Sequence, residues 1–461
     1  MTVPAPSWRT VRDRAVRLDP TRRSETVSEP VRPSGLRRLC AAGAALALGA
    51  TLAACGSADA GPPQLTWYIN PDNGGQTQIA QQCSDEADGA YTITTSLLPR
   101  DAASQREQLA RRLAAGDRSL DIMSLDPPYI PELAEPGFLA PVPEDLVRSS
   151  TQDVVDGAVQ GATWDDELVA VPFWANTQLL WYRESVAEEA GLDMSEPVTW
   201  DQLIDAAETT DSHLGIQGIR AESMTVWVNA LYESQGQPII EDPGAPADET
   251  QLALDSPAGA EASRIIGTIG AEGLAGPGAT TQDENVAMAQ FQGDQGSFMV
   301  NWPFVYTATQ TSVEQGSVDQ EVLDDMKWTT YPQVSEDQES APPLGGIDLG
   351  VGASSEHQDL AYEAIRCIAS SEKQAQYFLS DGNPPASTTA YEDPEVQDAY
   401  PMAPEIRESL ERAAPRPQTP FYNEISLGIQ QHWTPISEVG EATPARSQEF
   451  IQSVLRGEAL L

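Results

Sequence analysis

Tryptophans stand beside planar polar side chains at three places in the chain. The three pairs are Trp67 with Asn70, Trp174 with Asn176, and Trp302 with Asn301. Flat aromatic faces can stack on the C–H surfaces of a pyranose ring, while planar amide, carboxylate and guanidinium groups make paired hydrogen bonds to neighbouring hydroxyls. The pattern is that of a site for a polyhydroxylated ligand, although the same tryptophans could each be ordinary core residues.

Residue types that drive catalysis or bind metal are poorly represented. The three histidines, His213, His357 and His432, have no metal-ligand spacing with cysteines or carboxylates. The sequence contains no nucleophile elbow, phosphate-binding loop or dinucleotide fingerprint. We therefore expect no enzyme activity, no metal and no cofactor. Because carboxylates are abundant, a secreted glycosidase with a carboxylate pair remains a remote alternative.

Alternating strands and helices open the part of the chain that carries these residues. Strands are expected at 65–69, 91–98 and 120–125, with helices at 76–86 and 104–115 between them. This order predicts a parallel sheet with right-handed crossovers. Ligands bind beyond the carboxyl ends of the strands in such sheets. The polar segments at those ends are 70–73, 100–101 and Asp126.

A second alternating unit follows the strand expected at 169–173. Further strands are expected at 215–220, 296–301, 326–331 and 347–351, and helices at 222–234, 257–269 and 283–291. The tail from His357 reads as mainly helical. The pattern predicts an α/β protein of two lobes, with the chain crossing between them more than once.

The excess of acidic residues limits which kinds of partner the protein can bind. Seventy acidic residues against 26 basic ones give a formal net charge of -44, which disfavours nucleic acid and anionic membrane surfaces. Only two lysines occur, Lys327 and Lys373. Adaptation to a salty exterior and a merely well-solvated acidic surface are both compatible with this composition.

The N-terminal region reads as an export signal with a lipid attachment site. Arg37 and Arg38 precede an apolar run over 39–54, which is short for a membrane span of about 20 residues. The tetrapeptide LAAC at 52–55 resembles a bacterial lipobox, in which Cys55 is acylated and becomes the first residue. We expect residues 1–54 to be removed, residues 55–63 to form a tether, and the rest to lie outside the cell.

Four cysteines are present, and two of them belong to this N-terminal region. Cys40 lies inside the signal and Cys55 closes the lipobox, which leaves Cys83 and Cys367. An oxidising exterior favours a disulfide between them, with two unconnected buried thiols as the alternative.

Segments spread over most of the chain are similar to family 1 extracellular solute-binding proteins, the substrate receptors of carbohydrate ABC importers, and especially to the trehalose-binding lipoproteins of that family. They are LPRDAASQREQLARRLAAGDRSLDIMSLD (98–126), NTQLLWYR (176–183), VNWPFV (300–305), LGGIDLGV (344–351), AYEAIRC (361–367), DGNPPA (381–386) and RPQTPFYNEIS (416–426). The resemblance implies a hinge-linked, two-lobed periplasmic-binding-protein-like fold with the ligand in the interlobe cleft. It also favours the Cys83–Cys367 disulfide.

The resemblance implies hydrogen-bonding roles for three side chains. Asp126 would accept hydrogen bonds from sugar hydroxyls, Asn176 would bond the sugar from an interlobe crossing, and Glu284 would reach in from the start of its helix. Each has a structural alternative. Asp126 could cap the turn at 127–128, Asn176 could satisfy backbone groups, and Glu284 could be an acid favoured by its helix dipole.

The family resemblance also bears on four further positions. Trp302 would stack on a glucose ring, Gly346 would let the backbone approach the ligand, and Arg416 would donate a fork of hydrogen bonds. The alternatives are an interlobe core tryptophan, a plain turn, and a surface pairing of the arginine with Glu405 or Glu411. Asn73 stands near the position where the trehalose binders carry an acid, so that contact departs from the family pattern.

These inferences combine into one expectation. Lobe 1 comprises 64–173 and about 304–370, and lobe 2 comprises 174–303 and about 371–461. The protein is expected to be a monomeric, lipid-anchored receptor on the extracellular face of the membrane. It would bind a disaccharide, with trehalose favoured, and deliver it to two permease subunits driven by a cytoplasmic ATPase. Maltose, another oligosaccharide or a glucosyl osmolyte are the alternative ligands.

Overall fold

The computed structural model describes residues 61–461. The predicted export signal, the lipobox and Cys55 lie outside the described residues. No helix in the described range combines the length and apolar character needed to cross a membrane.

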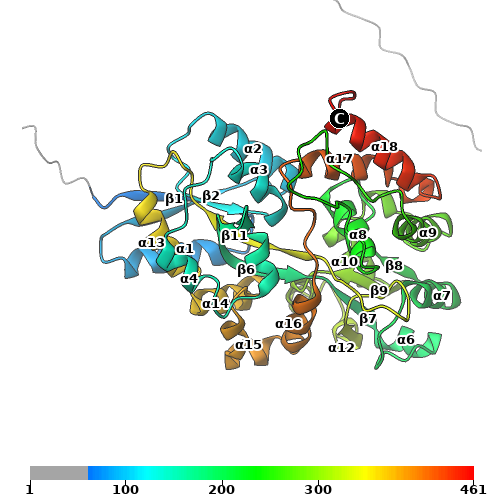
Figure 1. Ribbon diagram of the computed structural model, residues 1–461. Helices are drawn as coiled ribbons and strands as arrows, with labels where there is room; N and C mark the ends of the chain where they lie inside the picture. The colour runs from blue at the N-terminus through cyan, green and yellow to red at the C-terminus, as the bar shows by residue number, and fades with distance from the viewer. Residues whose placement is uncertain (1–60) are drawn as a thin grey trace, which may run out of the picture. The chain divides into compact units, whose positions relative to one another are not determined.

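Two sheets organise the fold (Figure 1). The first has the order β2-β1-β3-β11-β6, and its strands are β1 (Gln64–Ile69), β2 (Thr92–Leu97), β3 (Ile122–Leu125), β6 (Val171–Thr177) and β11 (Leu344–Gly350). The second has the order β10-β7-β9-β8, and its strands are β7 (Leu179–Arg183), β8 (His213–Gly215), β9 (Gly296–Asn301) and β10 (Met326–Thr329). A small hairpin pairs β4 (Thr163–Trp164) with β5 (Glu167–Leu168).

The opening β-α-β-α-β prediction is confirmed. β1 runs parallel to β2 and to β3, with α1 (Gly75–Glu86) and α2 (Ala102–Ala114) as the connections. β1 is almost wholly buried because Leu65, Trp67 and Ile69 fill the core. The start of α2 is fixed by Asp101, whose side chain accepts a hydrogen bond from the Ser104 amide at 2.8 Å. These elements therefore bring the carboxyl ends of the strands to one edge of the sheet.

Helices pack around each sheet. Those of the first lobe are α3 (Ile130–Ala134), α4 (Glu144–Ser149), α5 (Asp156–Gly161), α13 (Gln358–Ile368), α14 (Ser371–Asp381), α15 (Pro394–Ala399) and α16 (Ala403–Arg412), besides α1 and α2. Those of the second lobe are α6 (Glu184–Ala190), α7 (Trp200–Thr210), α8 (Glu222–Glu233), α9 (Pro257–Ala271), α10 (Glu284–Phe291), α11 (Phe304–Glu314), α12 (Gln320–Asp325), α17 (Tyr422–His432) and α18 (Thr443–Leu455). Single 3-10 turns are η1 (Pro127–Tyr129), η2 (Ala279–Thr281), η3 (Thr388–Glu392) and η4 (Ile436–Glu438).

Within residues 61–461 the chain passes between the two lobes at three places. The first is Gln178, between β6 and β7, the second is the segment 330–343 between β10 and β11, and the third is 413–421 between α16 and α17. The second and third run side by side, because the Leu344 amide donates to the Ala414 carbonyl at 2.9 Å and the Ala414 amide donates to the Pro342 carbonyl at 2.9 Å. The two-lobed α/β prediction is thus confirmed.

The strands divide differently from the predicted boundaries at two places. β10 pairs antiparallel with β7 and so lies in the second sheet, although about 304–370 was assigned to lobe 1. α14 and α16 contact α1 and β6 of the first lobe, although about 371–461 was assigned to lobe 2. The strand predicted at 215–220 is also misplaced, since β8 covers His213–Gly215 and shares only Gly215 with that range.

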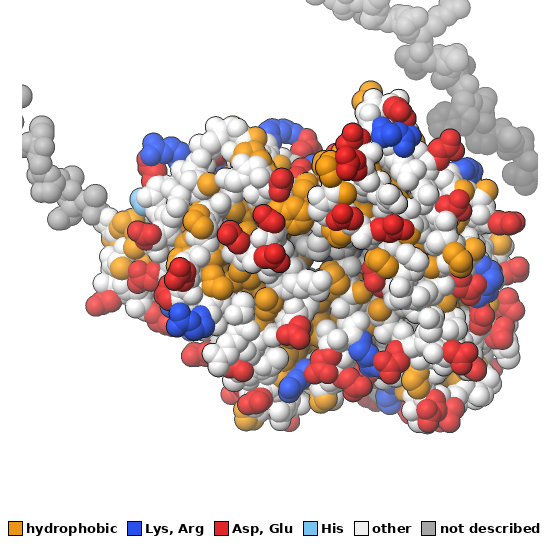
Figure 2. All heavy atoms as spheres, viewed as in Figure 1, with side chains coloured by type: hydrophobic (Ala, Val, Ile, Leu, Met, Phe, Trp, Pro, Cys, Tyr) orange, Lys and Arg blue, Asp and Glu red, His pale blue; other side chains and the backbone are white. Residues whose placement is uncertain are grey.

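Two further predictions concern the surface and the cysteines. Cys83 on α1 and Cys367 on α13 form a disulfide with their Cα atoms 5.9 Å apart, as expected. On the face shown in Figure 2, acidic side chains are widely spread and basic ones are sparse.

Candidate functional site

An arginine from the third crossing segment joins the two lobes. The Nη1 of Arg416 donates to Glu222 Oε1 at 2.8 Å and to Asp126 Oδ2 at 3.2 Å. Its Nη2 donates to Asp126 Oδ1 at 2.5 Å. Asp126 follows β3 in the first lobe, whereas Glu222 begins α8 in the second lobe. The predicted residues Asp126 and Arg416 are therefore brought together, and Arg416 pairs with neither Glu405 nor Glu411.

This ion-pair network is almost closed to solvent. The Arg416 side chain is 5% exposed, and those of Asp126 and Glu222 are 17% and 11% exposed. Burial disfavours the charge on Arg416, but Asp126, Tyr422 and Glu222 outweigh it and raise the arginine pKa well above its usual value. With both acids ionised, two negative charges face one positive charge, so the network carries a net charge of −1.

Asn176, Trp302 and Gly345 form a second group. Asn176 on β6 lies opposite Gly345 on β11 in the first sheet. The indole of Trp302 covers this glycine so closely that a Cβ added at Gly345 would lie 3.0 Å from the ring atom Cη2. The prediction named Gly346, but Gly345 is the glycine that faces Trp302. The Trp302 ring thus lies beside the strand pair that carries Asn176. Asn176 is 6% exposed and its Oδ1 accepts the Thr177 backbone N–H at 3.0 Å, so it satisfies a backbone group, as the structural alternative expects.

The buried Asn301 links Glu284 to this second group. Its Nδ2 donates to the Glu284 carbonyl at 2.9 Å, and its Oδ1 accepts from the Trp302 amide at 2.9 Å. Glu284 is the first residue of α10, whose N-cap is Asp283. Burial raises the pKa of the Glu284 carboxyl, although its own backbone N–H opposes this shift. Asn301 thus fixes the two predicted residues relative to each other.

The remaining two predicted residues make contacts within the protein. Gly346 has a φ of 141°, and a Cβ there would lie 2.3 Å from the Trp174 carbonyl oxygen. Its lack of a side chain is therefore required by packing between β11 and β6. Asn73 is exposed, and its backbone N–H donates to Asp381 Oδ1 at 2.6 Å. A ligand contact of either residue stays a prediction.

A buried acid that the sequence reasoning missed lies near Asp126. Asp348 on β11 is 1% exposed, and its Oδ2 has no hydrogen-bond partner among the described residues. Burial, and then the charge of Asp126, raise the pKa of Asp348 well above its usual value. Its position in the middle of an apolar strand gave no signal, because burial of a carboxyl there depends on packing against Gly161 and Pro127 of distant segments.

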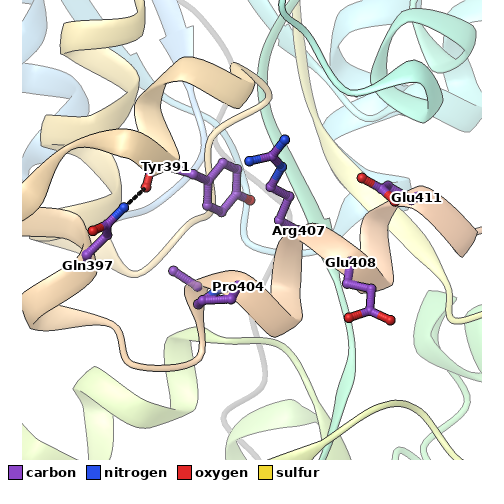
Figure 3. A pocket seen from close by; sticks show the side chains of 7 residues that line it. Tyr391, Gln397, Pro404, Arg407, Glu408 and Glu411 are labelled. Atoms are coloured by element: carbon purple, nitrogen blue, oxygen red, sulfur yellow. Dashed lines mark hydrogen bonds between the residues drawn. The ribbon is translucent and has the colours of Figure 1, made fainter.

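Metal binding finds no support in this range. Between residues 61 and 461, no group of three or more histidine, cysteine, aspartate or glutamate side chains is arranged to hold a metal ion. A hollow lies along α16, lined by Ala403, Pro404, Arg407, Glu408 and Glu411 together with Tyr391 and Gln397 (Figure 3). It contains none of the predicted ligand residues.

Comparisons with known proteins identify the family of the chain. The family model for bacterial extracellular solute-binding proteins matches residues 87–375, which is more than half of the chain. A "probable ABC transporter-binding protein" of Deinococcus radiodurans is 25% identical over 405 residues, covering 83% of this chain and 90% of that protein. A "maltotriose-binding protein" of Pyrococcus abyssi is 23% identical, covering 66% of this chain and 62% of that protein.

The solved structures of similar fold include sugar receptors. The maltose-bound MalE3 of T. maritima superposes with a TM-score of 0.73 at 22% identity, covering 85% of this chain and 99% of that one. The GacH receptor of Streptomyces glaucescens, solved unliganded and with acarbose, gives a TM-score of 0.69 at 18% identity and covers 86% of this chain and 98% of that one. The family match and the fold thus define a two-lobed solute-binding protein. The chain belongs to the bacterial extracellular solute-binding protein family.

Proposed function

We propose that this protein is the lipid-anchored, substrate-binding component of an ABC sugar importer. It binds a disaccharide, with trehalose favoured, and delivers it to two permease subunits driven by a cytoplasmic ATPase. Cys55 carries the lipid, and the protein works as a monomer on the extracellular face of the membrane, without enzyme activity. Its family and the names of its relatives support the receptor role.

The observation that carries the sugar assignment is the surface formed by Trp302 over Gly345 beside Asn176. An indole supplies a stacking face of the size of a pyranose ring. The Asn176 amide supplies its Nδ2 donor, since its Oδ1 already accepts the Thr177 backbone N–H. Asp126 and Arg416 add planar groups for vicinal hydroxyls. No positively charged group is left uncompensated in the Arg416 network, which disfavours an anionic ligand.

Hinge closure is the proposed mechanism. The lobes rotate about the three crossing segments and enclose the sugar between the two groups of polar residues. Closure removes water from the hydroxyl contacts, and the permease then distinguishes the closed form from the open one.

Maltose is the second candidate ligand. The specific support for it is that a relative is named as a maltotriose-binding protein and that a similar fold was solved with maltose. Both candidates are built of glucose rings, and they differ in how the two rings are joined. The same stacking face could therefore serve either sugar.

Calorimetry tests the proposal. The exported chain carrying Cys55→Ser, which prevents lipid attachment, is titrated with trehalose, maltose and glucose. Trp302→Ala is expected to weaken disaccharide binding at least tenfold, equivalent to about 1.4 kcal/mol. Trp164→Ala is the matched control, because Trp164 lies on the β4–β5 hairpin and its Nε1 bonds Glu135 instead. If none of the three sugars binds, the sugar assignment is refuted while the fold family stands.

A further inference from the structure

Glu222 is the most heavily hydrogen-bonded carboxylate of the interlobe network. Its Oε1 accepts from Arg416 Nη1 at 2.8 Å and from the Tyr422 hydroxyl. Its Oε2 accepts from Ser426 Oγ at 2.6 Å, from the Tyr129 hydroxyl at 3.3 Å and from Gln430 Nε2 at 3.5 Å. Neither sequence motifs nor family resemblance assigned this residue a role.

The partners of Glu222 come from separate parts of the fold. Tyr422, Ser426 and Gln430 lie on α17, and Tyr129 lies in η1 of the first lobe. The ring of Tyr129 also packs edge-on against that of Tyr422, with centroids 5.2 Å apart. Glu222 is thereby held by both lobes, so its carboxylate has one defined position from which to hold Arg416.

The guanidinium of Arg416 is bonded to carboxylates from both lobes. Both Nη atoms are engaged by carboxylates, and Nε is buried with no partner among the described residues. A guanidinium held at one end by Glu222 presents a fixed fork toward Asp126, where a ligand hydroxyl could share it. Without Glu222, the fork would keep only one anchoring carboxylate.

We propose that Glu222 is a positioning residue that orients Arg416 for the ligand and, through its charge, makes the site select neutral sugars over anionic ones. The inference rests on the proposed sugar-binding function. Its physical basis is the charge count. One arginine between two buried carboxylates leaves a net negative charge, which repels a phosphate or uronate group at short range.

The two parts of the proposal are separated by two variants. Glu222→Gln removes the charge at nearly constant size and brings the network to zero net charge. Glu222→Asp keeps the charge, but its shorter side chain cannot reach Arg416 as closely. Glu189→Gln is the matched control, because Glu189 is exposed on α6 and its side chain makes none of the hydrogen bonds or ion pairs found in the described residues.

The experiment measures dissociation constants for trehalose and for trehalose 6-phosphate on the chain carrying Cys55→Ser. The parent protein should bind the neutral sugar at least a hundredfold more tightly. Glu222→Gln should narrow this ratio at least tenfold, Glu222→Asp should weaken trehalose about tenfold with the ratio preserved, and Glu189→Gln should change neither value. Thermal unfolding confirms that each variant is folded.

The outcomes distinguish this inference from the proposed function. If the parent binds trehalose but Glu222→Gln leaves the ratio unchanged, the charge role is overturned. If Glu222→Gln does not fold, an unchanged trehalose affinity in Glu222→Asp still overturns the positioning role. If the parent binds neither trehalose, maltose nor glucose, it is the proposed sugar-binding function that fails.

Discussion

Removing the disulfide with Cys83→Ala and Cys367→Ala should lower the stability of the protein by an amount set by its loop. The two cysteines are separated by 284 residues, so the bond closes most of the described chain into one ring. Loop-closure entropy predicts a loss of about 5.6 kcal/mol for a ring of this size. Unfolding entropy of about 2.1 cal/mol/K per residue, taken over residues 61–461, converts this loss to a fall of about 7 °C in Tm.

The variant is expected to remain folded. Cys83 is fully buried in a hydrophobic cluster that keeps its other members, and Lys373 on α14 still pairs with Glu86 on α1 at 2.9 Å. Differential scanning calorimetry of parent and variant, each with and without reductant, measures the effect. Reductant should lower the Tm of the parent and leave that of the variant unchanged. Equal Tm values for oxidised parent and variant would refute the loop-entropy reasoning.

Three further substitutions test the packing and the buried acids. Gly346→Ala should lower the free energy of unfolding in urea by at least about 3 kcal/mol. Its φ of 141° is strained for alanine, and the added Cβ would lie 2.3 Å from the Trp174 carbonyl oxygen. Gly440→Ala is the control and should be nearly neutral, because a Cβ there meets open space. Burial raises the pKa of Glu233 from 4.5 to about 7, so the stability of the protein should fall as pH rises between these values. Glu233→Gln should remove up to about 3 kcal/mol of this pH dependence. Identical stability profiles against pH for variant and parent would contradict the prediction. Asp348→Asn should stabilise the protein at pH 7 and have little effect near pH 4. The reason is that the raised pKa of Asp348 makes its ionisation unfavourable in the folded state. A variant less stable than the parent at pH 7 would overturn this prediction.

The parts of the fold that could be predicted are those with local signals. The first sheet follows from the alternation of short apolar runs with amphipathic helices, as at Leu109 and Leu113, which are both buried on α2. The sheet to which β10 belongs could not be predicted in this way. Its pairing joins Trp328 to Trp181, which are far apart in sequence. The residues of a single strand do not indicate which partner strand it will pair with at the edge of a sheet.

The residues of the candidate site also differ in whether the sequence carries a local signal for them. Asp126 was predicted because it follows a strand, and Arg416 because its segment resembles a family motif. Their partner Glu222 lies 194 residues from Arg416 and reads in the sequence as an ordinary acid at the start of a helix. Which carboxylate meets the arginine depends on how the third crossing segment passes α8, and that is a property of tertiary packing.

The positions of the candidate ligand residues connect binding to lobe movement. Asn176 lies two residues before the crossing at Gln178, whose side chain donates to Gln217 in the second lobe at 3.1 Å. Gly345 adjoins the crossing that bonds Ala414, and Arg416 lies two residues beyond that alanine. A rotation at these crossings necessarily moves the residues beside them, so a sugar that fixes those residues also fixes the angle between the lobes. We therefore expect Gln178→Ala, which removes the hydrogen bond to Gln217 at the first crossing, to change the ligand affinity measured by calorimetry, because it alters the free energy of closure.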